Sequence, residues 1–210
     1  MSDIKSINNR IDTEICYNTI SKLEDNNLLE EYKKCKSVKN KVTTLSSIMK
    51  KYKVSNKILK YIISDYFIHL IPPGTKGVIR GNKFNKIVKK YIEDLNLDNK
   101  FDVQFEKQCA DTSEIPDWYI REKKTKKIII GFNQLDIVSG GQQTNRGAKY
   151  LLDNKYNTNK SKLLCVICNK INFTSNKNKA FKLFHVGFTN NTLCYLNNLG
   201  TIIKDFFNIN

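Results

Sequence analysis

Helical periodicity dominates the first seventy residues. Apolar residues recur at roughly helical spacing among polar ones from Ile11 to Leu29, and again over residues 43–48 and 58–70. The segment has little glycine and no proline, so no strong helix breaker interrupts it. We therefore predict an all-helical N-terminal lobe, residues 1–71, with a Lys-rich surface.

The pattern changes after the Pro72-Pro73-Gly74 break, which we take as the end of this lobe. Beyond it, apolar residues from Phe84 to Leu95 follow at spacings of 3, 1, 3, 1 and 3, which predicts an amphipathic helix with one packed face. Alternating or continuous apolar runs after this helix predict strands. The further elements predicted are a strand at 101–105, a hairpin of strands at 118–121 and 127–134 around a basic turn, a helix at 142–152, a strand at 163–171, an apolar segment at 180–188 and a closing helix at 193–207.

The composition is that of a folded chain outside the membrane. Of 210 residues, 40% are hydrophobic, which is enough to bury a core. The longest apolar runs, such as residues 128–130, are far shorter than the about 20 residues of a membrane-spanning helix. The opening MSDIKSINNR contains no apolar stretch of signal-peptide length. We expect an intracellular protein, in a microbe, a virus-infected cell or a virion, that is not secreted and has no membrane partner.

Charge narrows the class of partner. Lys and Arg number 36 against 20 Asp and Glu, a net charge of +16. Part of the lysine excess reflects coding bias, because the chain is rich in Lys, Asn and Ile and poor in Ala and Arg, as in an AT-rich genome. Such bias does not account for so large an excess over acidic residues. The charge therefore favours a polyanionic partner, most simply nucleic acid.

Two short patterns argue against other functions. Cys165 and Cys168 have the spacing of a zinc-binding pair, but a zinc site needs four ligands and the sequence has no second closely spaced pair. Their place in a predicted buried strand favours packing, with cysteine as a small hydrophobic residue. The segment GTKG at residues 74–77 lacks the full phosphate-loop pattern, so we expect neither a nucleoside triphosphatase nor a nucleotide cofactor.

After the helical lobe the predicted order is helix, strand, strand, strand, helix, strand, and a Pro-Asp pair ending in Asp117 opens the second strand. This arrangement resembles the core of the PD-(D/E)XK nuclease superfamily, which includes many type II restriction endonucleases. RGNKFNKIV at residues 80–88 is similar to the G-x-x-F-(E/N) helix opening of such nucleases. GFNQLDIVSGGQQTNRGAKYL at residues 131–151 is similar to the segment after their active-site strand. The resemblance covers residues 75–190.

The resemblance implies both a fold and an activity. The fold is α/β, with a restriction-endonuclease-like core of a mixed central sheet flanked by helices, in a domain of residues 72–210. The activity is that of a Mg²⁺-dependent deoxyribonuclease, with Mn²⁺ as a substitute metal, which hydrolyses phosphodiester bonds in double-stranded DNA at a short sequence. A palindromic target would imply a homodimer, because the symmetry of the protein mirrors that of its site.

The chemistry of phosphodiester hydrolysis indicates where the metal would bind. Mg²⁺ takes oxygen ligands from one or two carboxylates, and Asp117 at a strand start supplies one. If the hairpin turn centres near Lys124, Asp117 lies across from about Gly131. Gln134 and Asp136 follow near the end of that strand and share a face, since they are two residues apart. We expect the metal ligands to be Asp117, Gln134 and Asp136.

The sequence departs from the family at this point, because Gln134-Leu135-Asp136 stands where an acid-x-lysine pair is expected. The glutamine can ligate a metal through its carbonyl but is neutral. The aspartate in the lysine position would hold a second metal or orient water. The missing cation would come from Lys149, which we include in the catalytic set, or from Arg146 on the following helix. Two alternatives stay open: a literal E-x-K at residues 122–124, which we place in the turn, and Glu114.

DNA contacts are expected mainly at the start of the 142–152 helix. Asn and Gln read adenine, and Arg reads guanine, each through two hydrogen bonds. Exposed helix N-termini also attract phosphate. The predicted DNA-binding residues are Gln142, Gln143, Asn145, Arg146 and Arg80.

Three rival functions stay open. A non-catalytic DNA-binding module with a decayed nuclease core predicts salt-sensitive binding and no cleavage in any divalent metal. A structure-selective nuclease of repair or recombination predicts cleavage governed by DNA shape. A basic structural or RNA-binding protein predicts no metal near Asp117.

Overall fold

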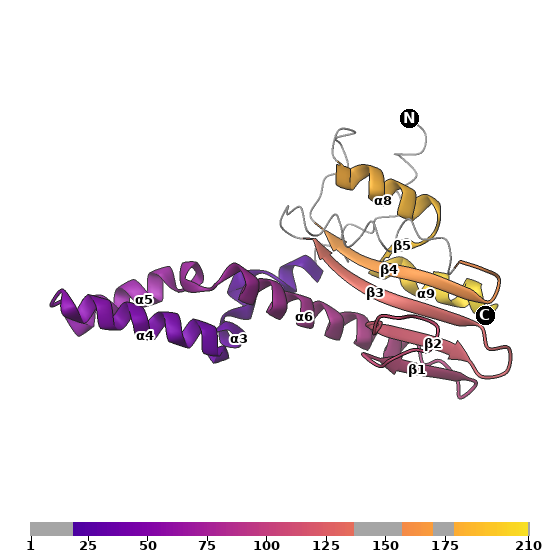
Figure 1. Cartoon of the computed structure of the whole chain (residues 1–210), viewed down its shortest axis with the longest axis horizontal. Helices are drawn as coiled ribbons and strands as arrows, with labels where there is room; N and C mark the ends of the chain where they lie inside the picture. Colours follow the sequence, from indigo (N-terminus) through magenta and orange to yellow (C-terminus); the bar gives the residue numbers. More distant parts are fainter. Residues whose placement is uncertain (1–18, 137–156, 170–178, 210) are drawn as a thin grey trace. The chain divides into compact units, whose positions relative to one another are not determined.

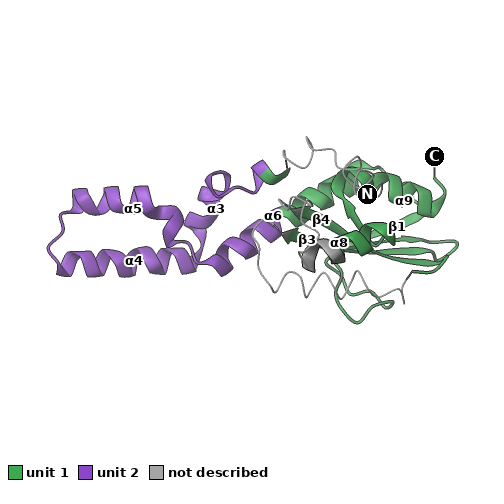
Figure 2. Cartoon of the chain, turned by 90° about the horizontal axis from the view of Figure 1, so that it is seen from above, with its two compact units in different colours: residues 1–20, 84–210 green, residues 21–83 purple. Residues whose placement is uncertain are grey.

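The chain divides into two compact units. The structure, a computed structural model, describes residues 19–136, 157–169 and 179–209 (Figure 1). One unit consists of residues 1–20 and 84–210, and the other of residues 21–83 (Figure 2). Each unit has buried apolar residues of its own.

Helix α6 (Pro73–Asp94) contains the boundary between the units. Proline is favoured at the first position of a helix, because its φ is preset and the N–H it lacks would be unpaired there anyway. The Lys76 N–H donates to the Pro72 carbonyl at 3.1 Å, which closes the first turn. The Pro-Pro-Gly segment is thus a helix start. The boundary falls at Lys83/Phe84, whereas the boundary predicted from the Pro-Pro-Gly segment is 71/72.

The unit of residues 21–83 is helical. Its elements are a 3₁₀ helix η1 (Asp25–Leu28), α3 (Leu29–Lys34), α4 (Lys36–Lys51), α5 (Asn56–Leu70) and the first half of α6. The Ser55 side chain caps α5 by accepting the Ile58 N–H at 3.4 Å. Leu28, Tyr32 and Val38 form its buried core together with other apolar side chains. The helical prediction is confirmed for the described part of the lobe.

A five-stranded mixed sheet forms the centre of the other unit (Figure 1). In spatial order its strands are β1 (Phe101–Phe105), β2 (Trp118–Glu122), β3 (Ile128–Asp136), β4 (Ser161–Asn169) and β5 (Leu193–Tyr195), with α8 (Lys179–Thr189) before β5 and α9 (Leu196–Phe207) after it. β1, β2 and β3 form an antiparallel meander, while β4 runs parallel to β3 and β5 parallel to β4. The continuous apolar runs at 128–130 and 163–167 are buried, as is typical of central parallel strands.

Helices cover both faces of the sheet. On one face, α9 places the Phe207 ring 4.9 Å from the Phe101 ring of β1. Gly200 of α9 faces the Tyr91 side chain of α6, so the two helices lie side by side on this face. On the opposite face, α8 stacks Phe188 on a β5 tyrosine at 5.1 Å between ring centroids. The strands are therefore enclosed between two helical layers.

The predicted α/β class is confirmed as a mixed five-stranded sheet flanked by helices. β5 was missed, because three residues directly before a helix give no strand signal of their own. The apolar segment at 180–188 is helix α8. The helix predicted at 142–152 lies outside the described residues. None of the described helices has the length and apolar character that crossing a membrane requires.

Candidate functional site

Asp117, immediately before β2, is held in place by groups that are distant in sequence. Its Oδ2 accepts the backbone N–H of Asn133 on β3 at 2.7 Å. Its Oδ1 accepts Nδ2 of Asn85 on α6 at 3.0 Å. The Asp117 carbonyl accepts the Glu106 N–H at 3.0 Å. The carboxylate is therefore held by two elements, strand β3 through Asn133 and helix α6 through Asn85.

The hydrogen bonds continue from Asp117 as a chain with one direction. Trp118 Nε1 donates to Asn133 Oδ1 at 3.1 Å, and Asn133 Nδ2 donates to Asn85 Oδ1 at 3.0 Å. An indole N–H can only donate, and an ionised carboxylate can only accept. These two ends fix the orientation of the two amide side chains between them. We call Trp118, Asn133, Asn85 and Asp117 the polar chain.

Gly131 makes room for the tryptophan that starts the polar chain. Trp118 pairs with Gly131 in the β2–β3 register, and a Cβ on Gly131 would overlap the ring carbons of Trp118. Asp117 was predicted to lie across from about Gly131, and the observed register differs from this by one residue. The register shows that the turn centres between Lys124 and Thr125, half a residue later than the prediction assumed.

Burial changes the acidity of Asp117. Removal of the carboxyl from water raises its pKa above the ordinary value, and the negative charge of Glu106 raises it further. The hydrogen bonds from Asn133 and Asn85 favour the ionised form and lower the pKa, but burial is the larger effect. A carboxyl with a raised pKa in an ordered polar network is a candidate functional group, although structural networks also produce such shifts.

The β3 residue that contacts the Asp117 carboxylate is Asn133, one position before the predicted ligand Gln134. Asp117 contacts Asn133 through the backbone N–H, which lies between the two faces of the strand. Because Gln134 follows Asn133 directly, strand alternation puts its side chain on the face opposite the Asn133 side chain. There, the Cys165 Sγ of β4 lies 4.0 Å from Gln134 Oε1. Asp136 is the last residue of β3.

Cys165 and Cys168 are packing residues of β4. Both are buried, and their three-residue spacing in a strand points their side chains to opposite faces, so the pair cannot share a metal ion. Burial raises the pKa of the Cys165 thiol to about 12, and the charge of Asp117 adds to the effect. The thiol is therefore neutral at ordinary pH, as expected of a cysteine that packs in a buried strand.

The oxygen atoms at Asp117 are of the type that binds hard cations such as Mg²⁺. Among the residues that the structure describes, one donor bonds each carboxylate oxygen, and oxygen is the ligand atom that Mg²⁺ prefers. The Gln134 carbonyl is a neutral oxygen donor at the next position along β3. In the ranges that the structure describes, no three His, Cys, Asp or Glu side chains form a metal-binding group. Asp117 thus fits as one ligand.

Arg80, predicted to contact DNA, binds a carboxylate within the 21–83 unit. Its Nη2 lies 2.7 Å from Asp25 Oδ1, and Lys76 Nζ lies 2.8 Å from Asp25 Oδ2. The Tyr32 hydroxyl donates to the same carboxylate at 2.8 Å. These contacts tie α6 to η1, so the Arg80 guanidinium has a structural role in this unit.

The remaining predicted residues fall into two groups. Lys149, Gln142, Gln143, Asn145 and Arg146 lie outside the described residues. The alternative E-x-K at residues 122–124 lies at the end of β2 and in the hairpin turn, as predicted, and Lys123 Nζ donates to the Asn99 carbonyl at 2.6 Å. Glu114 lies in the segment that joins β1 to β2.

Asn85 and Asn133 are the two residues of the polar chain that were not predicted from the sequence. Asn85 occupies the last position of the G-x-x-F-(E/N) pattern at residues 81–85, which is a signal that could have found it. Asn133 has no such signal. Its role depends on the strand register, and a shift of one residue moves every side chain to the other face.

A buried, preorganised carboxylate at the start of a strand can ligate a cation, accept a proton or anchor a turn. The raised pKa of Asp117 is compatible with each of these three roles. The groups around the carboxylate therefore decide between them. Comparison of the chain with known protein families, curated proteins and solved structures finds no match in any of the three.

Proposed function

We propose that the chain is a Mg²⁺-dependent DNA endonuclease of the restriction type, with Asp117 as a metal ligand. The observation that carries this proposal is the position of the Asp117 carboxylate, fixed at the start of β2 and bonded to the adjacent strand β3. The order of an antiparallel meander followed by a parallel strand supports it, because that order resembles the restriction-endonuclease-like core. The net charge of +16 suits a DNA partner.

Hydrolysis of a phosphodiester needs a neutralised phosphate, an activated water and a fixed geometry. When bound, Mg²⁺ supplies a polarised phosphate oxygen and a lowered pKa for a coordinated water. The polar chain supplies the fixed geometry, because hydrogen bonds on both oxygens keep the Asp117 carboxylate from rotating. In this proposal Gln134 and Asp136 are the further ligands and Lys149 is the cation that stabilises the transition state.

A non-catalytic DNA-binding module is the second candidate, and the groups around Asp117 favour it. The two residues that hydrogen-bond its carboxylate, Asn85 and Asn133, are neutral amides. Gln134 also stands where the family has an acid. A fully satisfied polar network can stabilise a fold without taking part in chemistry. This candidate predicts DNA binding that weakens with salt, and no cleavage in Mg²⁺ or Mn²⁺.

Cleavage of mixed plasmid and phage DNA by the purified full chain tests the proposal. In Mg²⁺ or Mn²⁺ we expect discrete fragments that disappear with EDTA. Asp117→Asn should lower the cleavage rate by about 10–100-fold or more, the usual cost of disturbing a metal site. The matched control is Asp94→Asn at the exposed end of α6, which removes the same charge and should cleave at the rate of the unmodified chain.

Each other outcome has a definite meaning. Fragments that survive Asp117→Asn would keep the function and remove Asp117 from the site. Cleavage that survives EDTA would contradict a metal-dependent mechanism. No cleavage by a preparation that still binds DNA would favour the non-catalytic module.

A further inference from the structure

The helical hairpin formed by α4 and α5 carries a concentrated positive charge. Residues 36–70 contain eight lysines and a single acidic residue, Asp65, which gives a net charge of +7. The lysines are all exposed and stand at positions 36, 39, 41, 50, 51, 53, 57 and 60. Among the described residues, the ion pairs involve other basic side chains, and none of these eight has an acidic partner.

The same hairpin exposes large apolar and aromatic side chains. Tyr52 in the turn is 77% exposed, Tyr61 is 61% exposed and Tyr66 is 58% exposed, and Ile48 and Ile58 are also exposed. These are five of the seven large hydrophobic side chains that are exposed in the described structure. A concentration of this kind marks an interaction surface more often than scattered exposure does.

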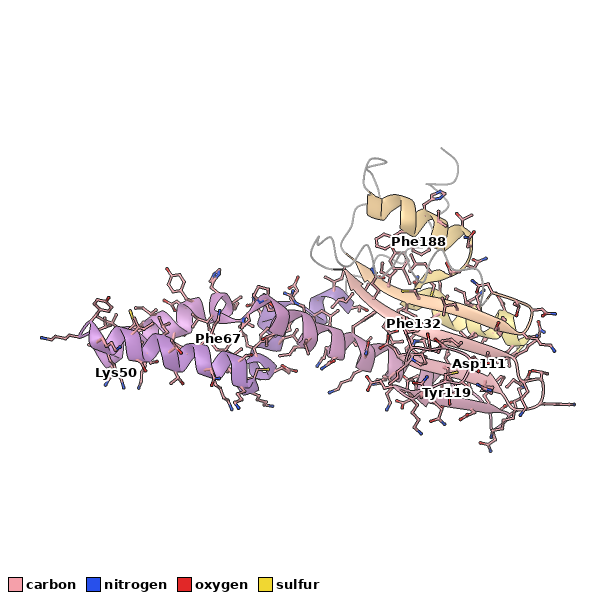
Figure 3. All side chains as sticks on the ribbon, viewed as in Figure 1. Lys50, Phe67, Asp111, Tyr119, Phe132 and Phe188 are labelled. Atoms are coloured by element: carbon pink, nitrogen blue, oxygen red, sulfur yellow. The ribbon has the colours of Figure 1, made fainter. Side chains whose placement is uncertain are left out.

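None of these exposed side chains packs in the interior of the hairpin. Phe67 packs inward against the core of the helical unit, whereas Lys50 projects outward near the turn (Figure 3). Val38 and Leu59 are the buried residues of α4 and α5. The exposed tyrosines and lysines therefore belong to the outer surface of both helices.

We propose that this surface, the basic hairpin, binds the backbone of double-stranded DNA. A second copy of the same surface would bring +7 against +7, so self-association through it is opposed by charge. A duplex is complementary, because it carries one negative charge per about 1.7 Å of its axis. α4 has 16 residues. It is thus about 24 Å long and could lie along roughly 14 phosphates.

The chemistry of the basic hairpin suits affinity more than sequence recognition. Its cations are all lysines, which act as flexible point charges on phosphate. Phosphate contacts fix position and orientation but carry no direct information on base sequence. The exposed tyrosines add hydroxyl donors for phosphate and rings for sugar or base contact. The inference rests on the DNA partner of the proposed function, but it does not require cleavage.

Binding of a fluorescent 30-bp duplex by the full chain tests the inference, with no divalent metal and NaCl varied from 50 to 200 mM. The test variant is Lys50→Gln/Lys53→Gln/Lys57→Gln. The matched control is Lys90→Gln/Lys107→Gln/Lys124→Gln, three exposed lysines of the other unit. Each phosphate contact contributes about 0.9 to the slope of log Kd on log salt. The test variant should therefore lower the slope by about 2–3 and weaken binding at least tenfold, while the control changes the slope by less than 1.

A second variant addresses the aromatic part of the surface. Tyr52→Ala/Tyr61→Ala should weaken binding several-fold without changing the salt slope, because no charge is removed. Far-UV circular dichroism of each variant shows whether the helices are kept, which is expected because all the changed side chains are exposed.

The inference and the nuclease proposal fail in different ways. Equal losses in the test variant and the control, or no loss in either, would overturn the inference and leave the nuclease proposal intact. A tenfold preference for RNA of the same length would overturn DNA as the partner. No binding of duplex by the unmodified chain would overturn the inference, whereas the nuclease proposal is decided by the cleavage assay in Mg²⁺ or Mn²⁺. Loss of cleavage in Asp117→Asn with normal DNA binding would support the nuclease proposal and would not bear on the basic hairpin.

Discussion

Two aspartates of this chain show how the charge of the partners decides the sign of a pKa shift. Burial raises the pKa of Asp25, but hydrogen bonds and charges from Lys76, Tyr32 and Arg80 outweigh burial, so the pKa is lowered. Within the described ranges, the groups that donate to the Asp117 carboxylate are neutral, so burial prevails and its pKa is raised. Burial alone would have predicted the same direction for both.

We predict that the two carboxyls titrate on opposite sides of the ordinary value of 3.8, with Asp25 below it and Asp117 above it. Carbon-detected NMR of the aspartate carboxyls measures both midpoints. Asp25→Asn and Asp117→Asn assign the signals, since each removes one of them. A midpoint for Asp117 at or below 3.8 would show that its hydrogen bonds outweigh burial.

The two aspartates also contribute to stability in different pH ranges. Because the folded pKa of Asp117 exceeds the unfolded value, its stabilising contribution is fully present below the unfolded pKa and is lost as pH rises through the folded pKa. The folded pKa of Asp25 is depressed, so its contribution is present above the unfolded pKa and is lost as pH falls through the folded pKa.

At the scale of elements, the pairing of β2 with β3 depends on one glycine. The Trp118 indole lies over Gly131, and the same contact sets which β3 residue meets the polar chain. An added methyl group has no space there, so either the ring or the strand has to move. The register and the geometry of Asp117 are therefore linked through a single small residue.

We predict that Gly131→Ala lowers the free energy of unfolding by about 2–3 kcal/mol or more, the cost of overpacking a filled site. Urea unfolding measures this change. Adding Trp118→Leu should recover part of the loss, because the smaller side chain frees the space that the ring occupies.

Gly81→Ala in α6 is the control for this prediction. Nothing lies within 4 Å of a Cβ at Gly81, so the change should leave stability unaltered or raise it by up to about 1 kcal/mol. Losses that simply add in the Gly131→Ala/Trp118→Leu double variant would show that the tryptophan ring is not the obstacle.

Sequence periodicity predicts most elements of the sheet-containing unit, because long apolar patterns at 84–95, 128–130 and 163–167 have one structural explanation each. Features that depend on single residues are harder to predict. The contact between Asp117 and the backbone N–H of Asn133 depends on the exact β2–β3 register, which the sequence pattern predicted only to within one residue. Asp117 was therefore named as a candidate from the sequence, whereas Asn85 and Asn133, which hold its carboxylate, were not.

At the scale of the whole molecule, the two proposed DNA-related surfaces belong to different units. The basic hairpin lies entirely in residues 21–83, and the polar chain lies entirely in residues 84–210. Each unit also has its own buried core. Changes to exposed residues of one unit should thus leave the fold of the other intact, which is why binding and cleavage can be measured separately.

Trp118 is the only tryptophan in the chain and is 1% exposed, so the protein has one tryptophan fluorophore and that fluorophore is buried. Its emission should be blue-shifted in the folded state and should report on the 84–210 unit alone. We predict that the midpoint of urea unfolding followed by tryptophan emission is the same whether or not the core of the 21–83 unit is weakened by Asp25→Asn. Far-UV circular dichroism measures the helices of both units, so its unfolding curve should shift in Asp25→Asn.

A shifted emission midpoint in Asp25→Asn would show that the two units unfold together. The same indole is also bonded through two amides to the carboxylate that is proposed to bind Mg²⁺. An ion that binds there would change the polarity felt at the indole N–H, and with it the wavelength and yield of the emitted light. The chain therefore carries its own optical sensor for the occupancy of its candidate site.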